Sequence, residues 1–270
     1  MTGHVPADSP WADPPATPGA GHPGSSEEAR IRRPVAPGSE TLFTREATEF
    51  LARLARQFRG RREALLAERT RWAEEVRQGV PLEPSPDVQA IRDREWTVPE
   101  PAPGLETRSV ELLGVPEART LVRGLNSTAD VFVADFEDLL SPTWEGVVRG
   151  HSNLVEAVRR SLEYATPDGE RFRIARRPAT LMVRPRGWHL VELHALVGGE
   201  PIPAPLFDFG LYAFHNARDL VRTGTGPYLY LPKLEHQGEA ALWREIFEAT
   251  EGELGLREGT IRASAAIETL

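Results

Sequence analysis

A cluster of carboxylates follows an apolar run near the middle of the chain. The segment VFVADFED contains Asp135, Glu137 and Asp138 directly after the apolar residues 131–134. Alternation along an extended strand would place Asp135 and Glu137 on one face and Asp138 on the other. Buried carboxylates require cationic partners or a metal ion, and carboxylates without cysteine or clustered histidine suit Mg²⁺.

Three later apolar runs, at 180–186, 228–234 and 261–268, also end in charged residues. The charged residues that we expect at these ends are Arg184, Arg186, Lys233, Glu235 and Glu268. The arginines suit a substrate that carries a carboxylate, because a guanidinium matches the geometry of that group. Lys233 could neutralise a cofactor phosphate or pair with Glu235. The alternative for the whole set is a rim of salt bridges without catalytic function.

Helical patterns at 144–162, 207–222 and 237–254 separate the four predicted strands, whose first member is 131–137. Strand–helix alternation with nearly continuous apolar strands predicts a parallel sheet in an α/β fold. We interpret the chain as a truncated (β/α)8 TIM barrel with about four strands, preceded by an N-terminal helical segment. Charged residues at successive carboxyl ends would then form a barrel mouth.

The predicted domain organisation has three parts. Residues 1–38 are rich in Pro, Gly and Ser and predict a disordered leader. Residues 39–106 hold a long helical pattern over 44–79, which Gly60 could split in two, and a Pro-rich linker that wraps the surface. Residues 107–270 form the first half of the barrel. A short strand near 109–114 and a helix over 116–125 place Asn126 before the first long strand, where it could cap a turn or reach a cofactor.

Composition excludes several classes of function. The formal net charge is −8, so no global basic field would attract nucleic acid. No apolar run approaches the length of a membrane span, and no secretory signal pattern is present at the N-terminus, so we expect a cytoplasmic protein without a membrane partner. The chain contains no cysteine, which excludes disulfides and thiolate chemistry.

Several long segments resemble the malate synthase family, specifically its A-type member in the glyoxylate cycle. They are ADFED followed by SPTW, LMVRPRGWHL, LFDFGLYAFHNA, GPYLYLPKLE and GTIRASAAIETL, with FRGRREALLAER and IRDREWTVPEPAPGLETRSVELLG upstream. The resemblance runs from about residue 44 to residue 270. It implies a β/α barrel that uses Mg²⁺ to condense acetyl-CoA with glyoxylate, giving malate and CoA.

The same resemblance implies roles for individual residues. Arg184 in RPRGW would hold glyoxylate and stabilise the developing enolate oxygen. Glu268 in IET would bind Mg²⁺ directly, while Asp135 and Glu137 would hold metal-bound water and orient the arginine. Arg186, Lys233 and Asn126 remain weaker candidates for contacts with substrate or cofactor.

The chain departs from the family pattern in two ways. Leu139 and Leu140 replace polar residues of the family's DFEDSNSPTW, which puts cofactor contacts there in question. The family's general base and second metal-ligating aspartate would lie beyond residue 270. We therefore expect this chain alone to be inactive unless a separately encoded second half joins it. The alternatives are a non-catalytic fragment or decayed gene product, and a Mg²⁺-dependent acyl-CoA lyase of the citrate lyase β-subunit kind.

Overall fold

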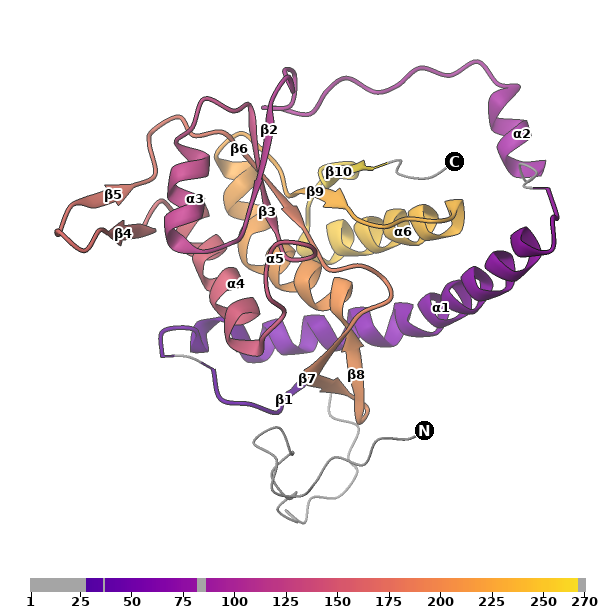
Figure 1. The fold of residues 1–270 in the computed structure, drawn as a ribbon, viewed down its shortest axis with the longest axis horizontal. Helices are drawn as coiled ribbons and strands as arrows, with labels where there is room; N and C mark the ends of the chain where they lie inside the picture. Colours follow the sequence, from indigo (N-terminus) through magenta and orange to yellow (C-terminus); the bar gives the residue numbers. More distant parts are fainter. Residues whose placement is uncertain (1–27, 36, 82–85, 267–270) are drawn as a thin grey trace, which may run out of the picture.

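A five-stranded parallel sheet forms the centre of the protein. The structure is a computed structural model that describes residues 28–35, 37–81 and 86–266. The sheet order is β10 (Arg262–Ala265), β9 (Tyr228–Leu231), β6 (Thr180–Arg184), β3 (Val131–Asp135) and β2 (Glu111–Gly114). The four predicted strands and the short fifth strand are therefore confirmed, and so is the open, barrel-type α/β sheet (Figure 1).

The strands end two or three residues earlier than alternation alone predicted, at Asp135, Arg184 and Leu231. Beyond these strand ends, backbone groups form hydrogen bonds with turn residues and with α1 instead of with a neighbouring strand. The charged residues that follow therefore lie in loops. The last predicted strand, 261–268, is described as Arg262–Ala265, and residues 267–270 lie outside the described part.

The two faces of the sheet bury different clusters. Phe132 and Ala134 belong to the large core shared with the helices, whereas Val131 and Val133 pack with Met182 in a small cluster on the other face. This alternation is the period of two expected for a strand that is buried on both faces. The small cluster is the inner face of the barrel-type sheet.

Four helices cover the outer face of the sheet, as Figure 1 shows. They are α3 (Ala118–Leu125), α4 (Trp144–Val158), α5 (Ala204–Arg222) and α6 (Gln237–Leu254). The predicted helical patterns match α4, α5 and α6 within four residues. Thr143 caps α4 by accepting a hydrogen bond from the Gly146 amide at 3.2 Å.

Helix α1 (Arg45–Arg77) runs along α5 and α6 and continues beyond the body of the molecule (Figure 1). It is a single helix of 33 residues, so Gly60 does not split the helical segment. Space around a Cβ built at Gly60 is open, and helical hydrogen bonds continue through it. The cost of one exposed glycine, about 1 kcal/mol, is smaller than the stabilisation from packing the buried face that contains Phe50 and Leu54.

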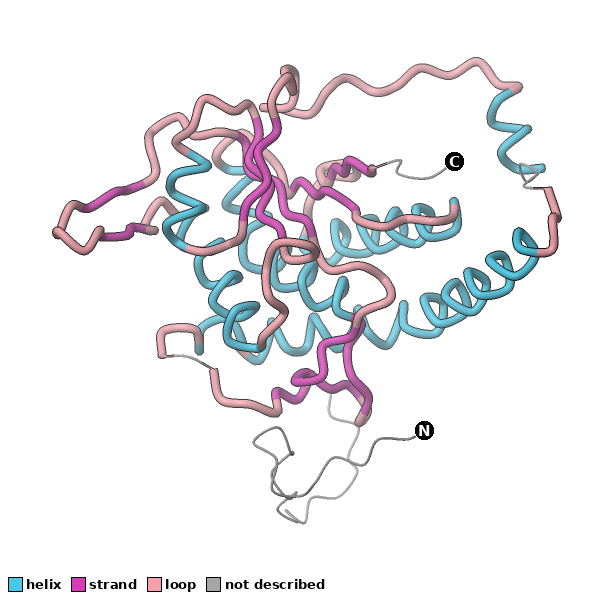
Figure 2. Tube along the Cα trace, in the orientation of Figure 1, coloured by secondary structure: helices cyan, strands magenta, loops and turns pink. Residues whose placement is uncertain are grey.

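Two small antiparallel sheets were not predicted. The hairpin of β7 (Val191–Val197) and β8 (Glu200–Pro203) pairs with β1 (Arg30–Ile31), and β4 (Glu163–Ala165) pairs with β5 (Arg171–Arg173). The β4–β5 hairpin projects from the body in Figure 2. Because β1 lies within residues 1–38, the predicted leader extends too far: its last part pairs with β7 and buries Ala29. Residues 1–27, which make up the rest of that leader, lie outside the described part.

The predicted linker does more than cross the surface. It contains α2 (Pro86–Arg92), and a second helical segment, η1 (Glu40–Phe43), precedes α1. Leu105 packs into the inner-face cluster, and the carbonyl of Pro103 accepts a hydrogen bond from the Tyr228 hydroxyl at 2.8 Å. The linker therefore covers the inner face near the beginning of the strands. In the described part of the chain, no helix has the length and apolarity needed to cross a membrane.

Candidate active site

The candidate site lies where β3 and β6 end. Asp135 and Arg184 are partners in the parallel register, and the two side chains form an ion pair at 3.3 Å. The Asp135 carboxylate is fully buried and also accepts hydrogen bonds from the amides of Glu137 and Asp138, at 2.8 and 3.1 Å. These bonds turn the chain away from the strand and hold the carboxylate in place.

Ion pairs hold the Arg184 guanidinium in place but do not engage all of its hydrogen-bond donors. Its guanidinium pairs with Asp135 and, at 2.6 Å, with Asp138, while its centre lies 5.7 Å from the ring centroid of Tyr230. The Nε atom is buried and has no hydrogen-bond partner among the described residues. A buried donor without a partner is costly, so this N–H is a natural point of attachment for an oxyanion.

Asp138 and Lys233 lie opposite each other beside Arg184, with Lys233 Nζ 3.1 Å from the Asp138 carboxylate. The hydrogen bond from Lys233, with the charges of Arg184 and Lys233, lowers the pKa of Asp138 although partial burial opposes this. The bond to Asp138 likewise raises the pKa of Lys233. Both groups are therefore charged at neutral pH, and Lys233 does not pair with Glu235 as one alternative had it.

Alternation misplaced two of these residues. It put Asp138 on the face away from Asp135, but the turn after Asp135 directs Asp138 onto Arg184. Alternation over 228–234 would also place Lys233 on the face of Leu229 and Leu231, which belong to the helix-facing core. Lys233 instead has a φ of 48°, a left-handed conformation that ends the strand geometry and accompanies its contact with Asp138.

Glu137 has a buried side chain that supports the loop after β6. One carboxylate oxygen accepts a hydrogen bond from the Gly187 amide at 2.6 Å, and the other lies 4.0 Å from Lys233 Nζ. A Cβ at Gly187 would lie 2.9 Å from the His189 ring and 3.3 Å from Glu137. The glycine therefore allows the loop to approach the carboxylate closely.

Arg186 lies two residues beyond Arg184 but has entirely different surroundings. Its buried guanidinium donates two hydrogen bonds to Asp208, at 2.9 and 2.8 Å, and one to Glu192 at 2.9 Å. Its backbone amide also donates to Asp208 at 2.9 Å. With these donors already engaged, Arg186 holds the loop and α5 together, and a direct substrate contact from it has no support in the geometry.

Asn126 is at the opposite end of the sheet, after α3 and before β3. Its side chain donates to the Arg173 carbonyl at 2.8 Å and accepts from the Ala175 amide at 2.7 Å. The nitrogen and the oxygen of the Asn126 side-chain amide thus both hold the segment that leads into β6. The structure does not bring Asn126 near Arg184.

The predicted direct metal ligand, Glu268, lies outside the described residues. Among the residues that are described, no group of three or more His, Cys, Asp or Glu side chains could hold a metal ion. The oxygens of Asp135 and Asp138 already face Arg184, Lys233 and backbone amides. The described carboxylates therefore do not fit a Mg²⁺ site by themselves.

Two arginines on α1, the buried Arg62 and the partly buried Arg69, were missed by the sequence analysis, although they position the site loops. Arg62 donates to the Trp188 carbonyl at 2.7 Å, and Arg69 donates to the Lys233 carbonyl at 2.8 Å. Arg69 also pairs with the buried Glu239. Their spacing of seven residues, two turns of one helix face, is the signal that could have identified them.

Comparison with known proteins agrees with this architecture. Residues 180–270 match the family described as malate synthase, TIM barrel domain, and residues 27–86 match the family described as malate synthase, N-terminal domain. The malate synthase of Myxococcus xanthus is 44% identical over 234 residues, which are 87% of this chain and 43% of that protein. Malate synthase A of Escherichia coli is 39% identical over 246 residues, 91% of this chain and 46% of that protein.

The fold and site define an α/β protein whose barrel-type parallel sheet presents an arginine and carboxylates where its strands end. With both family matches and the relatives taken together, the chain belongs to the malate synthase family. It spans less than half the length of the relatives named above.

Proposed function

We propose that this chain contributes the arginine-bearing part of a malate synthase active site, which condenses acetyl-CoA with glyoxylate to give malate and CoA. The observation that carries the proposal is the Arg184 guanidinium, which is anchored by two carboxylates and has a buried Nε that no other described residue engages. Glyoxylate carries a carboxylate, and the condensation develops negative charge on the carbonyl oxygen of the acetyl group. A fixed guanidinium stabilises both.

The surrounding residues have supporting roles in this proposal. Asp135 keeps the guanidinium oriented, because it is buried and fixed by two backbone amides. Glu137 holds the loop after β6 through Gly187. Lys233 adds a second positive charge beside Asp138 and thereby offsets part of the acidic cluster. Orientation of this kind reduces the reorganisation needed as charge develops.

Mg²⁺ belongs to the proposal through the resemblance alone, with Glu268 as its ligand. A bound Mg²⁺ would supply Lewis-acid polarisation of the glyoxylate aldehyde. A cytoplasmic location is likewise proposed, and one relative, from Candida tropicalis, is described as glyoxysomal.

We further propose that these 270 residues do not turn over on their own. The relatives are about twice as long, and no residue here is assigned to the general base or to the second metal-ligating aspartate. A separately encoded partner that supplies these groups would restore turnover. Release of CoA thiol by the purified chain, given acetyl-CoA, glyoxylate and Mg²⁺, would contradict this part of the proposal.

A chimera tests the assignment of Arg184. Residues 1–265 of this chain are joined to the remaining part of the Myxococcus xanthus relative, and CoA thiol release is measured with and without glyoxylate. We expect glyoxylate-dependent release that falls about a hundredfold or more in Arg184→Lys, because lysine lacks the planar fork. Arg244→Gln, an exposed arginine on α6, is the matched control and should leave the rate unchanged.

Two outcomes would contradict the assignment. A chimera that unfolds cooperatively but releases no CoA shows that this chain cannot supply its part of the site. Cleavage of malyl-CoA without net hydrolysis would favour the lyase alternative instead.

A further inference from the structure

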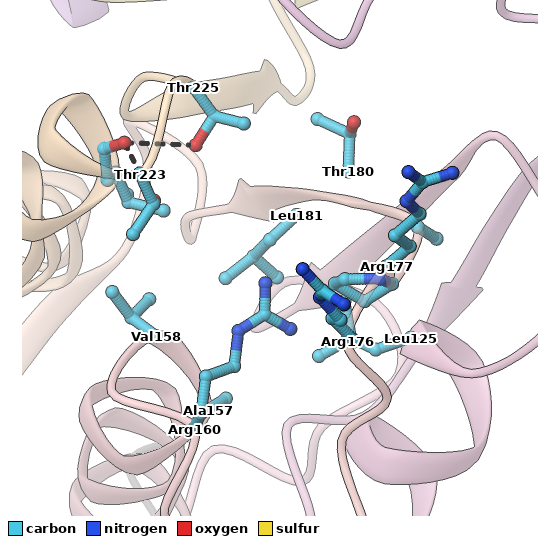
Figure 3. A pocket seen from close by; sticks show the side chains of 13 residues that line it. Leu125, Ala157, Val158, Arg160, Arg176, Arg177, Thr180, Leu181, Thr223 and Thr225 are labelled. Carbon is cyan, nitrogen blue, oxygen red and sulfur yellow. Dashed lines mark hydrogen bonds between the residues drawn. The ribbon is translucent and has the colours of Figure 1, made fainter.

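A cavity lies at the other end of β6 from Arg184. Its volume is about 290 Å³, and it is formed by the ends of α3, α4 and α5 and by the segment that leads into β6. Figure 3 shows the guanidiniums of Arg160 and Arg176 close together in this opening, whereas Arg177 extends toward Thr180. Thr180 and Arg184 are four strand positions apart, which is about 13 Å, so the two sites are separate.

The lining of this cavity is positively charged and unbalanced. Among the described residues that line it are three arginines, Arg160, Arg176 and Arg177, and no carboxylate. Within the described part of the chain, Arg176 and Arg177 make no hydrogen bond or ion pair, and Arg160 reaches only the Ala175 carbonyl, at 3.3 Å. Like charges on one cavity lining repel one another when no acid lies between them, so an anion would stabilise this arrangement.

Neighbouring arginines show that this lack of partners is local. Arg171 and Arg173, on β5, both pair with Glu163 on β4, at 2.8 and 2.7 Å. The same segment thus neutralises two of its arginines with a carboxylate and leaves the next two facing a cavity.

The backbone at Arg160 provides an independent observation. Its φ is 61°, a left-handed conformation just after α4, where glycine is the residue usually found. Burial lowers the pKa of Arg160, and no carboxylate offsets this effect. A long cationic side chain is therefore present at a position where both the backbone and the desolvation disfavour it.

The rest of the lining is apolar or cannot donate to a ligand. Leu125, Val158, Leu181 and Leu220 contribute aliphatic surface. The hydroxyls of Thr180, Thr223 and Thr225 donate to the backbone carbonyls of Gly104 and Leu220. The guanidinium groups are therefore the donors that remain for a ligand, next to an apolar floor.

We propose that this cavity binds a small organic phosphate monoester, whose phosphate lies between Arg160 and Arg176 and whose apolar body contacts the aliphatic floor. Two adjacent guanidiniums, with the charge of Arg177 on the same lining, match a dianion better than a monocarboxylate, because each can donate two hydrogen bonds to phosphate oxygens. The inference does not depend on the reaction at Arg184.

Isothermal titration calorimetry of the 270-residue chain tests the site, with phenyl phosphate as the probe at low ionic strength. Inorganic phosphate, phenylacetate and phenol are the comparison ligands. We expect phenyl phosphate to bind tightest and to weaken as salt is added. Arg160→Gly and Arg176→Gln should each weaken binding about tenfold, which is about 1.4 kcal/mol, while Arg244→Gln should not change it.

Arg160→Gly separates binding from stability because glycine suits the left-handed backbone. Its thermal midpoint should equal or exceed that of the parent. Arg176→Gln changes an exposed side chain and tests the same site if Arg160→Gly destabilises the fold. Absence of binding at millimolar phenyl phosphate overturns the proposal, as does equal affinity in the Arg176 and Arg244 variants. Inorganic phosphate binding as tightly as phenyl phosphate contradicts the role of the floor, and tighter phenylacetate binding contradicts the choice of phosphate.

Discussion

Arg184 and Arg186 are two residues apart in one short segment, yet the structure uses them in opposite ways. Arg186 is enclosed, and its guanidinium is engaged by Asp208 and Glu192. Arg184 pairs with the buried carboxylate of Asp135 and the half-exposed carboxylate of Asp138, and its buried Nε has no hydrogen-bond partner in the part of the chain that the structure describes. The comparison separates an arginine that holds the fold together from an arginine that is available to a substrate.

Burial of the acidic partners accounts for the difference. Asp208 and Glu192 are almost completely excluded from solvent, so removing one leaves an uncompensated charge in a medium of low dielectric constant. Asp138 is 46% exposed, and water can replace much of its contribution. Stability should therefore depend on the Arg186 cluster more than on the Arg184 cluster.

The largest expected effect is on the Arg186 cluster. Asp208→Ala leaves the buried Arg186 with Glu192 as its one remaining carboxylate, and should lower the free energy of unfolding by about 3–5 kcal/mol. Urea denaturation monitored by circular dichroism measures this change. Asp138→Ala, the matched change beside Arg184, should cost no more than about 1 kcal/mol. Equal losses in the two variants would remove the proposed distinction.

The second-largest expected effect is the loss of stability of the Arg186 cluster in acid. Burial raises the pKa of Asp208, but the charge of Arg186 and the hydrogen bonds from His151 and Arg186 outweigh it and lower that pKa to about 2. A carboxylate with a lowered folded-state pKa contributes stability above its ordinary pKa and loses it as the pH falls toward about 2. This contribution should be about 2 kcal/mol between pH 5 and pH 2.

His151 adds to the acid sensitivity at higher pH. Burial lowers its pKa despite the nearby Asp208, so the unfolded chain takes up a proton near pH 6.5 that the folded chain does not. Stability should therefore begin to fall below about pH 6.5. Urea midpoints at several pH values measure the loss of stability from both groups. Asp208→Asn should reduce the loss of stability between pH 5 and pH 2. An unchanged slope in that variant would show that other groups are responsible.

Arg184→Gln should have an intermediate effect on stability and a much larger effect on function. Asp135 keeps its two backbone donors, and Asp138 becomes more hydrated, so the expected cost is about 1–2 kcal/mol by urea denaturation. A loss as large as that of Asp208→Ala would place Arg184 in the same structural class as Arg186.

The smallest expected effect is at Lys233. Lys233→Gly removes the ion pair with Asp138 but suits the φ of 48°, so the two changes oppose each other. The free energy of unfolding should change by less than about 1 kcal/mol. Thermal unfolding at low and high salt measures it, and a loss above about 2 kcal/mol would mean that Lys233 is structural.

Much of the fold could be predicted because the apolar periodicity is strong. The strands that contain Val131 and Met182 are buried on both faces, and the helices between them follow the helical period. The hairpins were missed, since their residues alternate weakly and their stability depends on distant partners, such as Leu196 for Arg30. Propensity does not determine such long-range pairing.

The sequence by itself determined the order of strands and helices, the approach of Asp135 to Arg184, and the family resemblance that the comparisons confirmed. Only the tertiary structure decided which charges are free. Strand alternation ends where turns begin, so the placement of Asp138 and Lys233 depended on local backbone geometry. Arg186 was closed off by residues on other elements, Asp208 and Glu192, because the energy of a charge depends on what surrounds it in space.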